Sequence, residues 1–256
     1  MSPAYIYSTL VSLMLSWCVS SPAFAEAPGV DLSGEINKDF AFQVEYALLL
    51  GAKEIRVESS GGNNLWALQV ANSLNERKST QLVVTGKCVS ACASLAFATD
   101  NVRITKDAFI AVHRTSLGIR YVLEASEFDL REERFEALNL YADEEARLLQ
   151  KGNRSASFFE QAMRETRSNC YQELVTTKDG LVLGYKSRPD AHYWMPDKET
   201  FNQYRGIDVS GQWPSRRDWV SNKKALDFIK KYKVIMTKSP DELTETPIKE
   251  FGKCEN

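Results

Sequence analysis

Histidine is scarce in this chain: among 256 residues there are only two, His113 and His192. A catalytic base drawn from histidine therefore has few candidates. An excess of positive charge is also lacking, because 32 basic residues face 34 acidic ones and the net charge is −2. This balance gives no electrostatic case for binding nucleic acid, so we expect no nucleic-acid partner.

The chain also lacks an uninterrupted apolar segment of the length that a transmembrane helix needs. The stretch Ile6–Val19 is short and interrupted by serines. Ala23-Phe24-Ala25 then forms a small-x-small cleavage site before Glu26, although no Lys or Arg precedes the apolar stretch. We favour a signal peptide over residues 1–25, cleaved after Ala25, above a lipoprotein signal at Cys18 or an uncleaved anchor. The protein is then expected to be periplasmic or secreted, with no integral membrane span after cleavage.

Cysteine usage agrees with export. Beyond Cys18 the chain has four cysteines, and an even count in an exported protein favours disulfides. The candidates are Cys88, Cys92, Cys170 and Cys254, and three connectivities are open. Cys88 and Cys92 are four residues apart, which is within bridging range on a helical turn. A zinc site would need two further ligands nearby and none is close in sequence, so we expect neither a metal nor another cofactor.

Strand-like and helix-like patterns alternate between Leu48 and Val112, which predicts β-α-β units and a mostly parallel sheet with right-handed crossovers. The length suits one α/β domain over residues 26–210, followed by a helical extension and polar tail over residues 211–256. The expected strands are 54–58, 81–85, 102–104 and 109–112, and the expected helices are one capped by Asn63 or Asn64 and one over 90–98.

Helical patterns dominate the second half of the chain. We expect a long charged helix over 126–151, a shorter one from a cap at Ser155 or Ser157 to Arg164, and one from 195–197 to Gly206. Residues 223–232 form a basic amphipathic helix, which we interpret as a solvated face in preference to a membrane-binding one. After Thr237 the polar tail is expected to be loosely ordered.

The candidate chemistry centres on Ser90, which follows a strand and Gly86 at the start of an expected helix. A helix N-terminus stabilises developing negative charge, but a serine nucleophile also needs an adjacent base. His113 ends the next strand, and strand ends and helix starts of a parallel sheet meet at one edge. The N–H groups of Gly61 or Gly62 and of Ala91 would complete an oxyanion hole. Each residue also has a purely structural interpretation: Ser90 could cap the helix, His113 could lie in the core, and Gly61-Gly62 could form a turn that binds no ligand.

The order strand, Ser-Gly-Gly, helix, strand, Gly-x-x-x-Ser, helix, strand, His resembles the proteolytic subunit of Clp protease and the wider Clp/crotonase superfamily. Cys88-Val89-Ser90-Ala91-Cys92-Ala93 resembles the segment around the nucleophile, and Val112-His113 resembles the segment with the base. The match covers about residues 48–208. It implies a ClpP/crotonase-like spiral of β-α-β units, Ser90 as nucleophile, His113 as base, and Gly61 and Ala91 as oxyanion donors. It also implies assembly into a homo-oligomer through the helix over 126–151.

The acid of the site has two candidates. Glu165 stands where the resemblance places the catalytic aspartate, at the end of the helix over 159–166. Asp190 lies nearer the segment 194–207, which resembles the family region after that aspartate. We rank Glu165 above Asp190, since a carboxylate of either length can orient a histidine. His192 lies among aromatic residues and is interpreted as structural.

The sequence therefore predicts an exported serine hydrolase, an ATP-independent peptidase acting on short or unfolded peptides. The cysteines on both sides of Ser90 depart from the family pattern, and a bridge there would hold the nucleophile turn rigid or block it. A cysteine nucleophile at Cys92 is disfavoured because a bridged cysteine is unreactive. The main alternative is a non-catalytic binding or assembly module that retains the fold. Acyl-CoA chemistry is disfavoured because the chain shows no clear basic site for the phosphates.

Overall fold

A computed structural model describes residues 29–125, 131, 133–166, 168–177, 180–189, 192–237, 240–243 and 254–255. The expected signal peptide (1–25) and Asp190 lie outside the described residues. Within the described part of the chain, none of the helices has the length and apolar character needed to cross a membrane.

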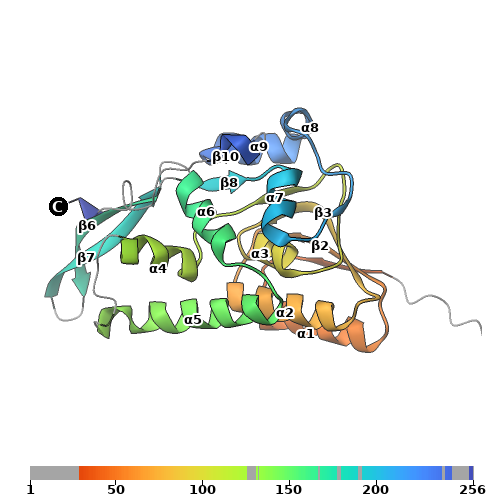
Figure 1. The fold of residues 1–256 in the computed structure, drawn as a ribbon, viewed down its shortest axis with the longest axis horizontal. Helices are drawn as coiled ribbons and strands as arrows, with labels where there is room; N and C mark the ends of the chain where they lie inside the picture. The colour runs from red at the N-terminus through yellow and green to blue at the C-terminus, as the bar shows by residue number, and fades with distance from the viewer. Residues whose placement is uncertain are drawn as a thin grey trace, which may run out of the picture.

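A parallel six-stranded sheet forms the centre of the molecule (Figure 1). Its order is β1-β2-β3-β4-β9, and β5 pairs with the second half of β3. The strands are β1 (Val30–Ser33), β2 (Glu54–Ser59), β3 (Gln81–Val89), β4 (Val102–Ile104), β5 (Phe109–Ala111) and β9 (Ser210–Gly211). All pairings in this sheet are parallel, which confirms the expected α/β class with a mostly parallel sheet.

Helices cover the sheet on both sides. Figure 1 shows α1 (Lys38–Leu49), α2 (Asn64–Glu76) and α5 (Glu136–Lys151) along one side of the molecule, and α8 (Arg216–Ser221) and α9 (Lys223–Lys231) along the opposite side. Between the sheet and α2 lies α3 (Ala91–Ala98), in which every residue is buried. The helix expected over 90–98 is thus confirmed, and α2 is capped by Asn63, the first of the two candidates.

Strand β3 extends further than its sequence pattern indicates. The pattern ends at Gly86, but β3 continues to Val89 because the register with β2 shifts between Val57 and Ser59 and lets Ser59 pair with Cys88. Gly86 lies at the shift, where a Cβ would come within 2.5 Å of Oε2 of Glu58, the far end of a flexible side chain. The extra residues carry β3 directly into Ser90.

The helix expected over 126–151 is shorter than predicted. The structure has α4 (Ser116–Ala125), a 3-10 turn over Glu133–Phe135 and α5 (Glu136–Lys151). Helix α4 packs against α5, and Oε2 of Glu145 in α5 accepts the N–H of Leu117 in the first turn of α4 at 2.8 Å. This contact joins residues far apart in the sequence and places a carboxyl group at the N-terminus of α4. No local sequence motif indicates it.

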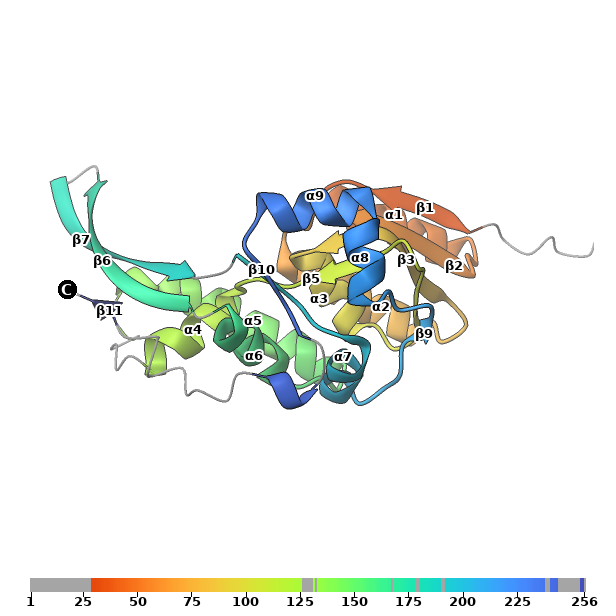
Figure 2. The same cartoon turned by 90° about the horizontal axis from the view of Figure 1, so that it is seen from above.

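The helix expected to end at Arg164 is α6 (Ser157–Glu165), although neither Ser155 nor Ser157 caps it; its N-cap is Ala156. An antiparallel hairpin follows, β6 (Ser168–Thr177) and β7 (Gly180–Pro189), where the sequence showed only a mixed segment. The hairpin projects from the body of the molecule beyond α4, as Figure 2 shows from above. The backbone register of β6 with β11 (Cys254–Glu255) sets Cys170 opposite Cys254.

The C-terminal elements return to the sheet. The helix expected from 195–197 to Gly206 is α7 (Lys198–Arg205), with Asp197 as N-cap and Gly206 in the left-handed conformation at φ 68°. Strand β8 (Tyr193–Met195) pairs with β10 (Val234–Met236), and Trp194 forms an antiparallel bridge with Val112. Helix α9 buries Ala225 and Phe228 against β5 and β8, so its apolar face is a core face.

Candidate active site

Ser90 has the backbone of a residue held under strain. Its φ is 60° and its ψ is −124°, and Ser90 and Asn153 are the two non-glycine residues with positive φ in the described part of the chain. Its N–H donates to the carbonyl of Ala111 at 2.9 Å, which ties the turn to β5. Although Ser90 is the N-cap of α3, its hydroxyl makes no capping bond. Ser90 is therefore not a side-chain cap of α3. Backbone strain such as a positive φ at a non-glycine residue concentrates at functional sites.

The Ser90 hydroxyl contacts the imidazole of His113. Oγ of Ser90 lies 2.5 Å from Nε2 of His113, a short hydrogen bond between a half-buried pair. His113 follows β5, and its ring packs against Tyr193 at 5.1 Å between centroids. Burial is the main cause that lowers the pKa of His113 to about 4, with the charge of Arg114 as the second cause. The imidazole is then neutral at neutral pH, which is the form that accepts a proton.

A disulfide encloses the turn that contains Ser90. Cys88 and Cys92 are bonded with a sequence separation of 4, and both are fully buried. The bridge joins the end of β3 to the first turn of α3, and Ser90 lies midway between them. It does not occlude Ser90, which remains half-buried and lines an open pocket.

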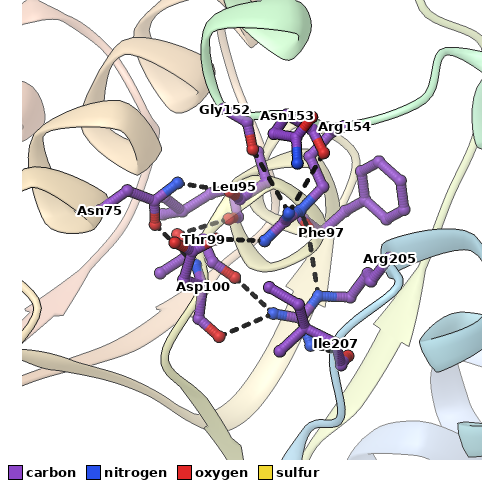
Figure 3. A network of polar contacts seen from close by, with 11 residues as sticks. Asn75, Leu95, Phe97, Thr99, Asp100, Gly152, Asn153, Arg154, Arg205 and Ile207 are labelled. Atoms are coloured by element: carbon purple, nitrogen blue, oxygen red, sulfur yellow. Dashed lines mark hydrogen bonds and ion pairs between the residues drawn. The ribbon is translucent and has the colours of Figure 1, made fainter.

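Two buried arginines fix the opposite end of α3 (Figure 3). Nε of Arg205 and Nε of Arg154 each donate to the carbonyl of Phe97 at 3.2 Å, and Arg205 also bonds the carbonyls of Thr99 and Asp100. Asn75 completes the set by donating to the carbonyl of Ala98 at 2.9 Å. The C-terminal carbonyls of a helix carry partial negative charge, so these cations stabilise it. Helix α3, which begins directly after Ser90, is held at both ends.

The N–H groups near Ser90 differ in whether they already have a hydrogen-bond partner. The N–H of Gly61 donates to Oγ of Ser59 at 3.0 Å, so it is already used within its own turn. Gly62 lines the pocket beside Ser90, and no described residue accepts a hydrogen bond from its N–H. The N–H of Ala91, the first residue of α3, has no partner within its helix. The N–H of Gly61 is thus occupied, whereas those of Gly62 and Ala91 are available beside Ser90, and Gly61 lies against the Ser90 side chain.

A pocket of about 240 Å³ opens beside the Ser90–His113 pair. Its lining is polar and comes from the start of α2, the start of α3, the segment after β5, and α5. The lining residues are Gly62, Asn63, Asn64, Leu65, Ser90, Ala91, His113, Arg114, Thr115, Ser116, Tyr141 and Glu145. Sequence reasoning missed Glu145, whose side chain is almost fully buried and whose pKa burial raises. Only its isolated position on an otherwise apolar helix face could have indicated it.

The expected acid Glu165 is not a partner of His113. Its carboxylate accepts Nε2 of Gln161 at 2.7 Å within α6, and Gln161 also accepts the hydroxyl of Tyr204. Helix α6 packs mainly against α4, and Gln161 and Glu165 lie one turn apart within α6. Among the described residues, the hydrogen-bond partner of the His113 ring is Ser90. Glu165 thus does not contact His113 in this structure, and because Asp190 lies outside the described residues, the ranking of the two acids stays a prediction.

The second histidine lies apart from the pocket. His192 is exposed and contacts the ring of Tyr232 at 6.4 Å between centroids, edge to face. Its N–H on the backbone donates to the carbonyl of Lys233 at 2.7 Å. Among the described residues, no group of three His, Cys, Asp or Glu side chains is arranged to hold a metal ion.

Comparison with known proteins finds distant likenesses only. No family model matches the chain, and no curated protein matches it. The ClpP protease catalytic domain from Plasmodium falciparum aligns with 74% of this chain and 89% of its own, at 15% identity and a TM-score of 0.41. A mutant of the 1510-N membrane-bound stomatin-specific protease aligns with 52% and 67%, at 15% identity and a TM-score of 0.35. An enoyl-CoA hydratase/isomerase from Xanthobacter autotrophicus Py2 aligns with 51% and 68%, at 14% identity and a TM-score of 0.26.

Proposed function

We propose that this protein is a serine hydrolase that cleaves peptide bonds without a nucleotide-driven partner. The observation that carries the proposal is the 2.5 Å contact between Oγ of Ser90 and Nε2 of His113, formed at a serine with φ 60°. A strained serine against a neutral imidazole, at a helix N-terminus and beside an open pocket, combines nucleophile, base and charge stabilisation.

The proposed reaction follows from this geometry. Oγ of Ser90 attacks the peptide carbonyl while Nε2 of His113 takes the hydroxyl proton. The N–H groups of Ala91 and Gly62 hold the carbonyl oxygen as it becomes negative. His113 then gives the proton to the leaving amine, and the C–N bond breaks to leave an acyl ester on Ser90. A water molecule, deprotonated by His113, hydrolyses that ester and restores the serine.

Asp190 is our proposed acid. The antiparallel bridge between Val112 and Trp194 sets Tyr193 beside His113, and Tyr193 contacts the His113 ring. Asp190 is three residues before Tyr193 in the chain. A carboxylate from this segment would stabilise the imidazolium that forms when Ser90 loses its proton.

Labelling with a fluorophosphonate tests the proposal. The purified, oxidised protein is incubated with the probe, and the modified peptide is identified by mass spectrometry. We expect labelling at Ser90, none in Ser90→Ala, and unchanged labelling in Ser94→Ala, a buried serine one turn further along α3. A folded, oxidised protein that takes up no label at Ser90 would instead favour the non-catalytic binding or assembly module.

Export is a separate proposal. The disulfide between Cys88 and Cys92 supports an oxidising compartment, as does the backbone register that sets Cys170 opposite Cys254 and suits a second bridge. Cell fractionation with N-terminal sequencing tests it. We expect the mature chain to begin at Glu26 in the periplasm or medium, and a chain that retains residues 1–25 in the cytoplasm would contradict it.

Assembly with further copies of the chain is also proposed. Helix α1 exposes Phe42, Tyr46 and Leu49, which are spaced four and three residues apart and share one face. Exposed fractions of 70% for Phe42 and 74% for Leu49 are high for such large apolar side chains, and α5 adds Leu140 at 64%. Light scattering after gel filtration should give an oligomer that Phe42→Glu dissociates; a monomeric wild type would contradict this.

A further inference from the structure

A second pocket lies next to the catalytic pair and is lined in part by the C-terminal helix α9. Its volume is about 250 Å³, below the roughly 300–1,000 Å³ typical of sites for drug-sized ligands and suited to one side chain. Ser60 and Val89 line it, and each immediately precedes a residue of the site, Gly61 or Ser90. The remaining lining residues are Lys87, Tyr193, Asp227, Phe228, Lys231 and Tyr232.

Aromatic rings connect this pocket to the catalytic imidazole. Tyr193 lies 4.9 Å from Phe228 and 5.3 Å from Tyr232, between ring centroids, and Phe228 and Tyr232 are 4.9 Å apart. Tyr193 also contacts His113 at 5.1 Å. The phenol groups of Tyr193 and Tyr232 are half-buried, so the rings present an apolar wall with polar edges. Such a wall favours an aromatic ligand group through edge-to-face contacts.

The charge around the pocket is positive. Lys87 and Lys231 contribute two ammonium groups against the single carboxylate of Asp227. Within the described part of the chain, neither lysine forms an ion pair, and Nζ of Lys231 lies 5.1 Å from the centroid of the Tyr232 ring. By contrast, Lys224 on the same helix pairs with Glu58 at 3.0 Å. Two unpaired cations at a half-buried pocket attract a carboxylate.

We propose that this pocket is a substrate subsite that selects peptides with an aromatic residue adjacent to an acidic one. The aromatic side chain packs on Tyr193 and Phe228, and the acidic side chain lies within reach of Lys87 and Lys231. This inference rests on the proposed peptidase function, because the pocket begins one residue from Ser90. It also gives α9 a role that its basic amphipathic pattern does not reveal: the apolar face is core, and one lysine faces the substrate.

Binding to the inactive Ser90→Ala protein tests the subsite without requiring catalysis. Fluorescence anisotropy is measured with three labelled peptides that differ only in a central pair, Asp-Phe, Lys-Phe or Asp-Ala. We expect the Asp-Phe peptide to bind about tenfold more tightly than either of the others, as a paired charge or a buried ring accounts for roughly that factor. Equal affinity for all three peptides would overturn the proposal.

Charge reversal within α9 supplies the matched control. In the Ser90→Ala background, Lys231→Glu should weaken Asp-Phe binding about tenfold and shift the preference toward Lys-Phe. Lys230→Glu changes the same charge at the neighbouring exposed residue, which does not line the pocket, and should leave the preference unchanged. Equal effects of the two variants would mean that the helix charge acts from a distance, and the subsite would be rejected.

Labelling of Ser90 and peptide binding test the hydrolase activity and the subsite independently. If a fluorophosphonate labels Ser90 but the three peptides bind equally, the proposed hydrolase activity is supported and the proposed subsite is rejected. If Ser90 stays unlabelled while the Asp-Phe preference and its loss in Lys231→Glu are observed, the pocket is a peptide-binding site of a non-catalytic protein. Tyr232→Leu, which keeps an apolar side chain at a half-buried position, should reduce the preference for Phe over Ala in either case.

Discussion

Gly61 lies directly against Ser90: a Cβ built on Gly61 would be 2.5 Å from Cβ of Ser90 and 3.0 Å from its Oγ. The φ of Gly61 is +104°, a region that side chains rarely adopt. Both facts require glycine at this position. Ser59, whose buried hydroxyl accepts the Gly61 N–H, holds the glycine turn in place from the other side.

Gly61→Ala should therefore displace Ser90. We expect loss of fluorophosphonate labelling and a fall of about 2–3 kcal/mol in the free energy of unfolding, from strain and overpacking together. Gly51→Ala is the matched control, because Gly51 also has positive φ (+81°) but open space around it. It should cost about 1 kcal/mol and leave labelling intact. Equal labelling in the two variants would show that the contact does not position Ser90.

The pH dependence of catalysis follows from the buried His113. Its pKa of about 4 lies below the ordinary value of 6.5, so the base stays neutral well into the acid range. We expect kcat/KM for a peptide substrate to be level between pH 5.5 and pH 8, as a rough window, and to fall only below it. A half-point near 6.5 would show that His113 is not the essential base or is not buried during turnover.

The same shift makes folding pH-dependent. Below pH 6.5 the unfolded chain binds a proton on His113 that the folded chain does not bind until the pH nears 4. Stability is thus complete above 6.5 and falls as the pH drops through this window, by up to about 3 kcal/mol. Urea unfolding at several pH values should show a smaller decline in His113→Asn than in the wild type.

The disulfide between Cys88 and Cys92 is expected to support the conformation of Ser90. Replacing both cysteines with alanine should lower the free energy of unfolding by about 2 kcal/mol, the chain-entropy value for so short a loop. Labelling of the folded fraction should also slow, because the strained φ of Ser90 needs support from its surroundings. If labelling, corrected for the folded fraction measured by circular dichroism, equals that of the wild type, the bridge stabilises the protein without positioning the serine.

Features encoded by neighbouring residues were predictable from the sequence. The helix with Asp197 at its start and Gly206 at its end has an oxygen cap and a left-handed glycine, and both signals are local. The Ser90–His113 pair was predictable because parallel strands bring their ends to one edge. The spacing of Cys88 and Cys92 allowed a bridge between them but left three connectivities open, and the structure has these two cysteines bonded.

Features that depend on contacts between residues far apart in the sequence were not predictable. The choice between Gly61 and Gly62 as donor depends on which N–H the Ser59 hydroxyl captures, and both glycines look alike in the sequence. The contact of Glu145 in α5 with the first turn of α4 joins residues far apart in the sequence, and no local pattern indicates it. Glu165 stands at a position that resembles the family's acid, but in the structure its carboxylate accepts Nε2 of Gln161, four residues earlier in α6.

The buried guanidinium of Arg205 should be among the strongest single contributors to stability. It reaches the carbonyls of Phe97, Thr99 and Asp100 at the end of α3, and burial lowers its pKa to about 10, so it remains charged at neutral pH. Arg205→Met removes the arginine donor from the carbonyls of Thr99 and Asp100, whereas Arg154 still donates to that of Phe97, and the change should cost about 3 kcal/mol. Thermal unfolding of Arg216→Met, an exposed arginine of α8, gives the control, with a change within about 0.5 kcal/mol. Similar melting temperatures for the two variants would contradict the role of Arg205.

The two candidate acids can be separated by matched amide substitutions. Asp190→Asn should reduce kcat by about 10³–10⁴-fold with little change in KM, because an orienting carboxylate acts on the base during proton transfer. Glu165→Gln keeps the shape of a side chain that bonds Gln161 and should leave kcat within about twofold while lowering stability. The variants are compared by peptide turnover and by urea unfolding. If Glu165→Gln lost turnover and Asp190→Asn kept it, the acid would have to reach His113 by a rearrangement of α6 that the present packing against α4 does not show.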